Sequence, residues 1–217
     1  GTTGIPKGVM LHHQAAVNYI WWAATNYVKG GQVNFPFYTS ISFDLTVTSL
    51  FSPLVTGNTV YVYGKDSNEF LIDKVVKDNK VEAVKLTPSH LKLLVKSAEI
   101  PGDTKIERFI LGGEELDSWL AAETLSVFNK EIEIINEYGP TEAAVGCMIY
   151  RFKDGDEARR TVSIGAPADN MKIYVLDDKL NPVPFGISGD IYIAGVGVAK
   201  GYLNRPKLNT EKFIQSP

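Results

Sequence analysis

Short apolar segments alternate with amphipathic segments over much of the chain, and this alternation constrains the fold more than any other feature. The apolar segments are rich in β-branched and aromatic residues and are expected to be strands over residues 59–63, 81–86, 107–113 and 132–139. The segments between them carry apolar residues at helical spacing and are expected to be helices over residues 69–79, 88–98 and 118–128. Because several of these strands are largely apolar, both faces of the sheet must be covered. The pattern therefore predicts a parallel sheet flanked by helices.

The remaining segments complete the expected fold. Helices are predicted over residues 12–29 and over residues 44–56, the second with Asp44 as a candidate N-cap. After about residue 145 strong helices no longer separate the strands, and short strands joined by Gly, Pro and Asp turns are expected. The expected fold class is α/β. A flavodoxin-like sheet over residues 1–144 is followed by a smaller β-rich subdomain, a distorted barrel, over residues 145–217.

The composition excludes several classes of function. Lys plus Arg number 22 and Asp plus Glu number 25, so the net charge is −3, and nucleic acid is not expected as a partner. No apolar run approaches the roughly 18–20 residues of a membrane span, so no membrane partner is expected either. The single cysteine, Cys147, cannot form an internal disulfide and favours a reducing, cytoplasmic compartment. Its immediate neighbours carry no positive charge, which favours a buried, inert thiol.

Three loops follow the predicted strands at the edge where such sheets bind ligands, and their sequences are KLTPSH, LGGEE and NEYGPTE. In the last of them Tyr138 offers an aromatic face on which a flat ring can stack. Thr141 adds a hydroxyl, and Glu142 adds the carboxylate type of ligand that Mg²⁺ prefers. An ordinary Gly-Pro turn with a surface glutamate is the alternative interpretation.

Two glycine-rich segments complete the set of candidate loops. The first, GTTGIPKGV, combines hydroxyls, glycines and Lys7, which are the parts of a phosphate cradle, although a solvated glycine loop fits equally well. No Ser or Thr follows the lysine as a Walker A loop requires. The second, GDIYIAGVGVAKGYL, lacks the helix that a dinucleotide fingerprint needs, so a strand followed by a tight turn is expected.

Together and in this order, these segments resemble the amino-acid adenylation domains of nonribosomal peptide synthetases, in the adenylate-forming (acyl-CoA synthetase) superfamily. GTTGIPKGV is similar to the phosphate-loop motif, SFDLT to the substrate-entry motif, NEYGPTE to the adenine-and-magnesium motif and GDIYIAGVGVAKGYL to the glycine-rich β motif. The resemblance implies that an amino acid reacts with Mg·ATP to give an aminoacyl adenylate and pyrophosphate. It also implies transfer of the acyl group to the phosphopantetheine thiol of a peptidyl carrier protein, with neighbouring synthetase domains as further partners.

The resemblance assigns roles to individual residues. Glu142 is the expected ligand of Mg²⁺, and Thr141 and Glu142 are the expected catalytic residues. The nucleotide ATP or AMP is expected to contact Thr2, Thr3, Lys7, Gly112, Gly113, Asn136, Tyr138 and Thr141. The family's ribose-binding aspartate and catalytic lysine lie on segments that the sequence does not include. The chain is therefore expected to be the central fragment of the large N-terminal subdomain and to be inactive alone.

The family's substrate pocket also maps onto this sequence. Asp44 matches the aspartate that pairs with the substrate α-ammonium group, and this favours an α-amino acid. The expected pocket residues are Asp44, Leu45, Thr48, Lys85, Ile110, Gly112, Glu137, Val145 and Gly146. Lys85 donates and Glu137 accepts hydrogen bonds, which suits a carboxamide, so L-asparagine is the expected substrate, with aspartate or glutamine next. The alternative is that Lys85 and Glu137 form a structural ion pair and that shape selects the substrate.

Two further functions remain open from the sequence. The first is an acyl- or aryl-CoA ligase, although an acid without an amine would leave the Asp44 carboxylate without a compensating cation. The second is a non-catalytic unit, an excised or grafted subdomain that binds substrate without turnover.

Overall fold

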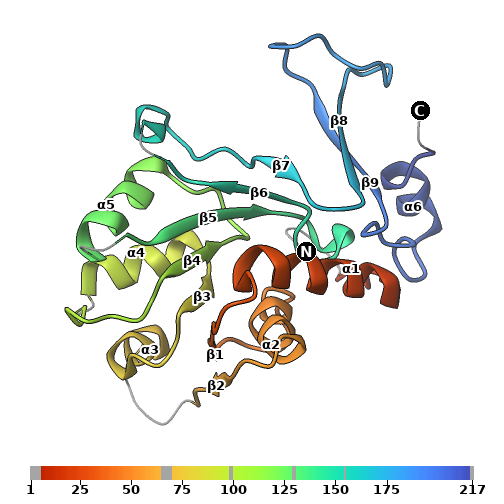
Figure 1. Cartoon of the computed structure of the whole chain (residues 1–217). Coiled ribbons are helices and arrows are strands. Elements are labelled where there is room, and N and C mark those ends of the chain that lie inside the picture. Colours follow the sequence, from red (N-terminus) through yellow and green to blue (C-terminus); the bar gives the residue numbers. More distant parts are fainter. Residues whose placement is uncertain (1–5, 65–69, 98–99, 129–130, 154, 216–217) are drawn as a thin grey trace.

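The computed structural model describes residues 6–64, 70–97, 100–128, 131–153 and 155–215, so the predicted roles of Thr2 and Thr3 lie outside the described residues. Figure 1 shows a central sheet with helices on both faces and an antiparallel hairpin that projects from it. The described helices are α1 (His13–Ala23), its π-helical continuation η1 (Ala24–Val28), α2 (Thr46–Val55), α3 (Leu71–Asp78), α4 (Pro88–Ser97), α5 (Ser118–Phe128) and α6 (Pro206–Lys212). Two single 3-10 turns are also described, η2 (Thr141–Ala143) and η3 (Asp156–Ala158). None of the helices in these ranges is long and apolar enough to cross a bilayer.

The central sheet has the strand order β3-β4-β5-β6-β7. Strands β3 (Ala83–Leu86), β4 (Arg108–Leu111) and β5 (Glu133–Tyr138) run parallel. Strands β6 (Met148–Arg151) and β7 (Ala166–Pro167) extend the sheet in the antiparallel sense. The predicted parallel sheet is therefore confirmed, and the chain continues in the same sheet after residue 144.

Alternate residues of the parallel strands point to opposite faces of the sheet. Val84, Phe109 and Ile134 pack in one apolar cluster with residues of α3, α4 and α5. Ile110 and Ile135 pack in a second cluster with residues of α1 and η1. The two-residue period places Lys85 and Glu137 on the second face, toward α1. The sheet thus presents its charged side chains to the N-terminal helix.

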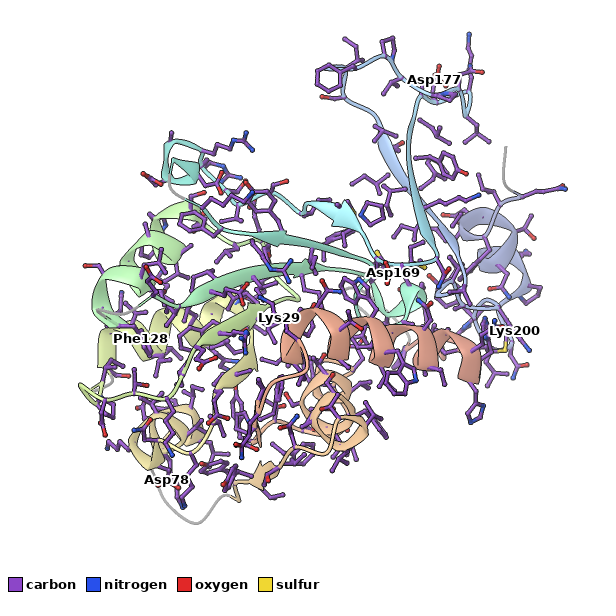
Figure 2. The ribbon with its side chains drawn as sticks, viewed as in Figure 1. Lys29, Asp78, Phe128, Asp169, Asp177 and Lys200 are labelled. Atoms are coloured by element: carbon purple, nitrogen blue, oxygen red, sulfur yellow. The ribbon has the colours of Figure 1, made fainter. Side chains whose placement is uncertain are left out.

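The remaining strands form two smaller sheets. Strands β1 (Phe35–Phe37) and β2 (Val60–Val62) pair in parallel, and the Asn34 carbonyl accepts from the backbone N–H of Ala83, so this ribbon lies beside β3. Strands β8 (Met171–Leu176) and β9 (Asp190–Gly195) form the projecting hairpin, with Asp177 at its far end (Figure 2). Among the described residues these strands close no barrel. The division of the chain at residue 144 stays a prediction.

One expected helix changes its geometry along its length, and one expected helix cap is wrong. The helix expected over residues 12–29 changes from α-helical to π-helical geometry at Ala24. Asp44 does not cap α2, because Leu45 occupies the N-cap position and makes no side-chain capping hydrogen bond. The Asp44 carboxylate instead accepts a hydrogen bond from Thr141, across the site described below.

Candidate functional site

A cavity of about 740 Å³ opens at the carboxyl ends of the parallel strands. Its walls include most of the predicted pocket residues, namely Asp44, Leu45, Lys85, Gly112, Glu137 and Val145. Gly113, predicted to contact the nucleotide, also lines it. Its other lining residues come from the loops after β1, β3, β4 and β5 and from the starts of α3 and α4. They include Tyr38, Phe43, Phe70, Thr87, His90 and Glu114. The topology therefore brings together residues that lie far apart in the sequence.

Lys85 and Glu137 form a buried ion pair in the wall of this cavity. Lys85 Nζ donates to Glu137 Oε1, and the side chains are only 1% and 2% exposed. Burial lowers the pKa of the Lys85 ammonium group, and the Glu137 carboxylate opposes this shift. In the structure Lys85 and Glu137 thus pair with each other, as the alternative interpretation of the sequence expected. This pairing does not remove the two residues from the cavity, since both line it.

Two glycines make room for this pair. A Cβ atom on Gly146 would lie 2.5 Å from Glu137 Cδ and 2.6 Å from Oε1, which is closer than real Cβ contacts allow. A Cβ atom on Gly112 would lie 3.1 Å from the Glu137 carbonyl oxygen and 3.5 Å from Lys85 Nζ. The sequence predicted that Gly146 lines the pocket. In the structure Gly146 instead leaves space for Glu137, which does line it.

Gly146→Ala is expected to lower the free energy of unfolding by about 1–3 kcal/mol, because the new methyl group overpacks the Glu137 side chain. Gly102→Ala is the matched control, since a Cβ atom there meets nothing within 4 Å, and its effect is expected to stay within about 0.5 kcal/mol. Urea unfolding of both variants measures the difference. Equal stability of the two variants would show that the cavity wall around Glu137 is not closely packed.

The loop before Gly146 has an unusual backbone. Ala144 and Val145 both have positive φ angles, of 55° and 75°. A β-branched residue rarely adopts this conformation, and such strain concentrates at ligand sites. Its effect here is to place Val145 in the cavity wall and Gly146 against Glu137.

Asp44 and Thr141 connect the predicted substrate and phosphate sites. Thr141 Oγ1 donates to Asp44 Oδ2 at 2.6 Å, although the two residues are 97 positions apart. Asp44 is partly buried and Thr141 is exposed, so both remain accessible to a ligand. A group bound by Asp44 would therefore lie next to the hydroxyl that the resemblance assigns to the nucleotide.

Glu142 and Lys7 lie together on the other side of this loop. Lys7 Nζ is 3.9 Å from Glu142 Oε1 and 4.8 Å from the centre of the Tyr202 ring. Tyr202 OH donates to Glu142 Oε1 at 2.6 Å, and burial together with this carboxylate raises the pKa of Tyr202 to about 12. The described residues contain no group of three or more His, Cys, Asp or Glu side chains that could hold a metal ion by themselves. One carboxylate beside a lysine instead fits Mg²⁺ that arrives with nucleotide phosphates, which is the usual way this ion is held.

Besides Gly146, Lys7, Thr141 and Glu142, four further predicted site residues do not line the cavity. Thr48 is fully buried and pairs with the hydroxyl of Tyr19, and Ile110 is fully buried in the apolar cluster beneath the site. Asn136 Nδ2 donates to the carbonyls of Val162 and Ser163, because the alternation along β5 turns it away from Glu137. Tyr138 is half-buried and packs against the second apolar cluster.

Sequence reasoning missed the residues behind Glu137. Tyr19 and Tyr27, which were not among the predicted site residues, both donate hydrogen bonds to its carboxylate. Burial and the nearby Glu137 raise the pKa of both hydroxyls well above the usual value, so both keep their protons. Cys147 is buried as expected, and burial raises the pKa of its thiol to about 12.

Comparison with known proteins places this chain in a family. The model of the family "AMP-binding enzyme" matches residues 1–203. The whole chain is 54% identical to part of tyrocidine synthase 3 of Brevibacillus parabrevis and 52% identical to part of bacitracin synthase 3 of Bacillus licheniformis. It is 50% identical to part of a mycosubtilin synthase polypeptide of Bacillus subtilis. The chain spans only 3% to 8% of the length of these relatives.

The fold has a close counterpart among solved structures. The N-terminal subdomain of Klebsiella oxytoca NpsA, solved in complex with 3-hydroxybenzoyl-AMSN, matches the whole chain over 55% of its own length, with a TM-score of 0.82 and 22% identity. An artificially fused adenylation–PCP di-domain, NpsA-ThdA, matches 98% of the chain over 39% of its own length, with a TM-score of 0.80 and 21% identity. The resemblance inferred from the sequence motifs is confirmed by the sequence matches, and the expected fold by the structural ones. The chain belongs to the family of AMP-binding enzymes.

Proposed function

We propose that this chain forms the substrate-binding part of an adenylation domain that activates L-asparagine. The proposal rests on the cavity, because Asp44 and the buried Lys85–Glu137 pair line the same cavity. Thr141 donates a hydrogen bond to Asp44 beside it. Asp44 binds the α-ammonium group of the substrate, which places the substrate carboxylate near Thr141. The side chain then extends toward Lys85 and Glu137.

The charged pair suits a carboxamide better than the alternatives. Lys85 has two N–H protons beyond the one that it directs to Glu137, and one of them donates to the amide oxygen. Glu137 accepts from the amide nitrogen. An aspartate side chain would place a second carboxylate beside Glu137, and the two negative charges would repel each other. An aliphatic side chain would desolvate Lys85 and Glu137 without forming a hydrogen bond to either.

The nucleotide occupies the edge beyond Asp44. We assign contacts with its phosphates to Lys7 and Thr141, and Glu142 is the side chain that would hold Mg²⁺. The ion supplies charge neutralisation on the phosphates when bound. The substrate carboxylate oxygen forms a bond to the α-phosphorus, and the bond to pyrophosphate breaks. The protein contributes positioning, because Asp44 and Thr141 lie within hydrogen-bond distance of each other.

The proposal extends to the parts of the reaction that lie outside the chain. The aminoacyl group passes to the phosphopantetheine thiol of a carrier protein, as the fused adenylation–PCP relative suggests. Residues 1–144 act as the substrate- and nucleotide-binding unit, and residues 145–217 as the β-rich unit that supports Glu142 through Tyr202.

ATP–pyrophosphate exchange by the full-length protein that contains this chain tests the proposal. The panel contains the twenty amino acids together with 3-hydroxybenzoate as an acid without an α-amine. Asparagine is expected to give the highest exchange rate, followed by aspartate or glutamine. Exchange restricted to hydrophobic amino acids would disprove the role of the charged pair, and exchange only with the aryl acid would disprove the role of Asp44.

Glu137→Gln is expected to narrow the preference for asparagine over aspartate by about tenfold, because the variant no longer repels the aspartate side chain. The measurement is the ratio of kcat/KM for the two substrates in the same variant. This ratio does not depend on the fraction of folded protein. An unchanged ratio would show that Glu137 does not face the substrate side chain.

A further inference from the structure

The Glu137 carboxylate is surrounded by hydrogen-bond donors from different elements. Lys85 Nζ, from β3, donates to Oε1, and the hydroxyl of Tyr27, from η1, donates to Oε2. The hydroxyl of Tyr19, from α1, lies 3.2 Å from Oε1 and 3.1 Å from Oε2. Lys85 and Glu137 line the cavity, whereas the two tyrosines are buried behind them.

These contacts leave the Glu137 carboxylate few free positions at which to accept a hydrogen bond. A carboxylate offers about four acceptor positions, and each tyrosine hydroxyl donates a single proton. The Tyr19 hydroxyl also pairs with Thr48 Oγ1, so Thr48 donates to Tyr19 when Tyr19 donates to Glu137. Lys85, Tyr19 and Tyr27 then occupy three of the positions. One position is left for a ligand in the cavity.

The π-helical turn explains how both tyrosines reach the same carboxylate. Residues eight positions apart in an α-helix point about 80° away from each other. In η1 the N–H of Lys29 donates to the carbonyl of Ala24 at 3.2 Å, and this wider turn rotates less per residue. Tyr27 is thereby turned toward the face that carries Tyr19. Lys29, labelled in Figure 2, then ties the end of η1 to Glu133 at the start of β5, at 2.7 Å.

We propose that Tyr19 and Tyr27 are positioning residues for recognition of the substrate amide, an inference that rests on the proposed function. They hold the Glu137 carboxylate in one orientation and leave it one acceptor position for a side-chain N–H of the substrate. Thr48 belongs to the same arrangement, because it fixes the hydroxyl direction of Tyr19. Selectivity for an amide thus depends on residues that do not touch the substrate.

The test compares two substrates that differ in whether the side chain can donate a hydrogen bond. L-Asparagine and L-aspartate β-methyl ester both present a side-chain carbonyl to Lys85, but only asparagine can donate an N–H to Glu137. Tyr27→Phe and Tyr19→Phe, in the full-length protein, are each expected to reduce the preference for asparagine over the ester by about tenfold. The loss is expected in the KM for asparagine, with the KM for ATP unchanged.

Tyr150→Phe is the matched control. It removes a tyrosine–carboxylate hydrogen bond of 3.0 Å, between Tyr150 and Asp156, that lies outside the cavity wall, and it is expected to leave the preference unchanged. A merely structural role for Tyr19 and Tyr27 would slow both substrates equally and would overturn the inference. A wild-type protein without any preference for asparagine would overturn the proposed function instead. Because the preference is a ratio within one variant, partial unfolding does not alter it, and either tyrosine variant alone decides the outcome.

Discussion

Breaking the Lys85–Glu137 pair is expected to lower the free energy of unfolding by about 3–5 kcal/mol in either single variant, Lys85→Met or Glu137→Gln. The reason is the burial of both side chains, at 1% and 2% exposure. Removing one partner leaves the other charge in a medium that solvates it poorly. Urea unfolding of the two variants and the wild type measures the loss.

The double variant separates the interaction between Lys85 and Glu137 from the effect of each substitution alone. Lys85→Met combined with Glu137→Gln contains no buried charge at this position, and the glutamine oxygen still accepts from Tyr19 and Tyr27. Its loss of stability is therefore expected to be smaller than the sum of the single losses by about 2 kcal/mol or more. Additive losses would mean that the two charges do not interact.

An exposed pair of the same residue types provides the control. Lys29 and Glu133 form an ion pair in which the side chains are 43% and 29% exposed. Lys29→Met is expected to cost at most about 1 kcal/mol, because water solvates both groups and screens their attraction. A Lys85→Met variant as stable as Lys29→Met would contradict the buried position of the pair.

The sequence predicted the sheet from short-range periodicity, and the resemblance to adenylation domains assigned the residues of the cavity. Lys85 and Glu137 lie at alternate positions from Ala83 and Ile135 on their strands, so the two-residue period alone places them on one face. The same period should have placed Asn136 on the opposite face, but the resemblance assigned it to the site. In the structure Asn136 Nδ2 donates to loop carbonyls, and its contact with the nucleotide stays a prediction.

The residues behind the cavity could not be predicted in the same way. Tyr19 and Tyr27 share a face only because α1 changes to π-helical geometry, and no residue type signals that change. Thr48 and Gly146 were assigned to the substrate pocket, but their contacts in the structure are of another kind. Thr48 acts on Tyr19, and Gly146 leaves room for Glu137. These contacts join elements distant in sequence, so they depend on how the helices pack onto the sheet.

Asp44→Asn is expected to reduce kcat/KM for asparagine by about 30-fold to several-thousand-fold, the range for losing one partner of a hydrogen-bonded charge pair. The asparagine side chain keeps the shape of Asp44, and its oxygen can still accept from Thr141 Oγ1, now 2.6 Å from Oδ2. The variant therefore removes the charge and leaves the proposed phosphate contact of Thr141 in place. Nucleotide binding, measured by calorimetry with AMP, is expected to change by less than about threefold.

Removing the amine from the substrate tests the same interaction from the other side. Succinamic acid is asparagine without its α-amine, and the wild-type protein is expected to activate it as poorly as Asp44→Asn activates asparagine. In the variant, asparagine and succinamic acid should then differ little, because the partner of the amine is gone. Asp177→Asn, at the far end of the β8–β9 hairpin, is the control and should retain the full preference (Figure 2). If Asp44→Asn still strongly preferred asparagine, the ammonium group would have to be bound elsewhere in the cavity.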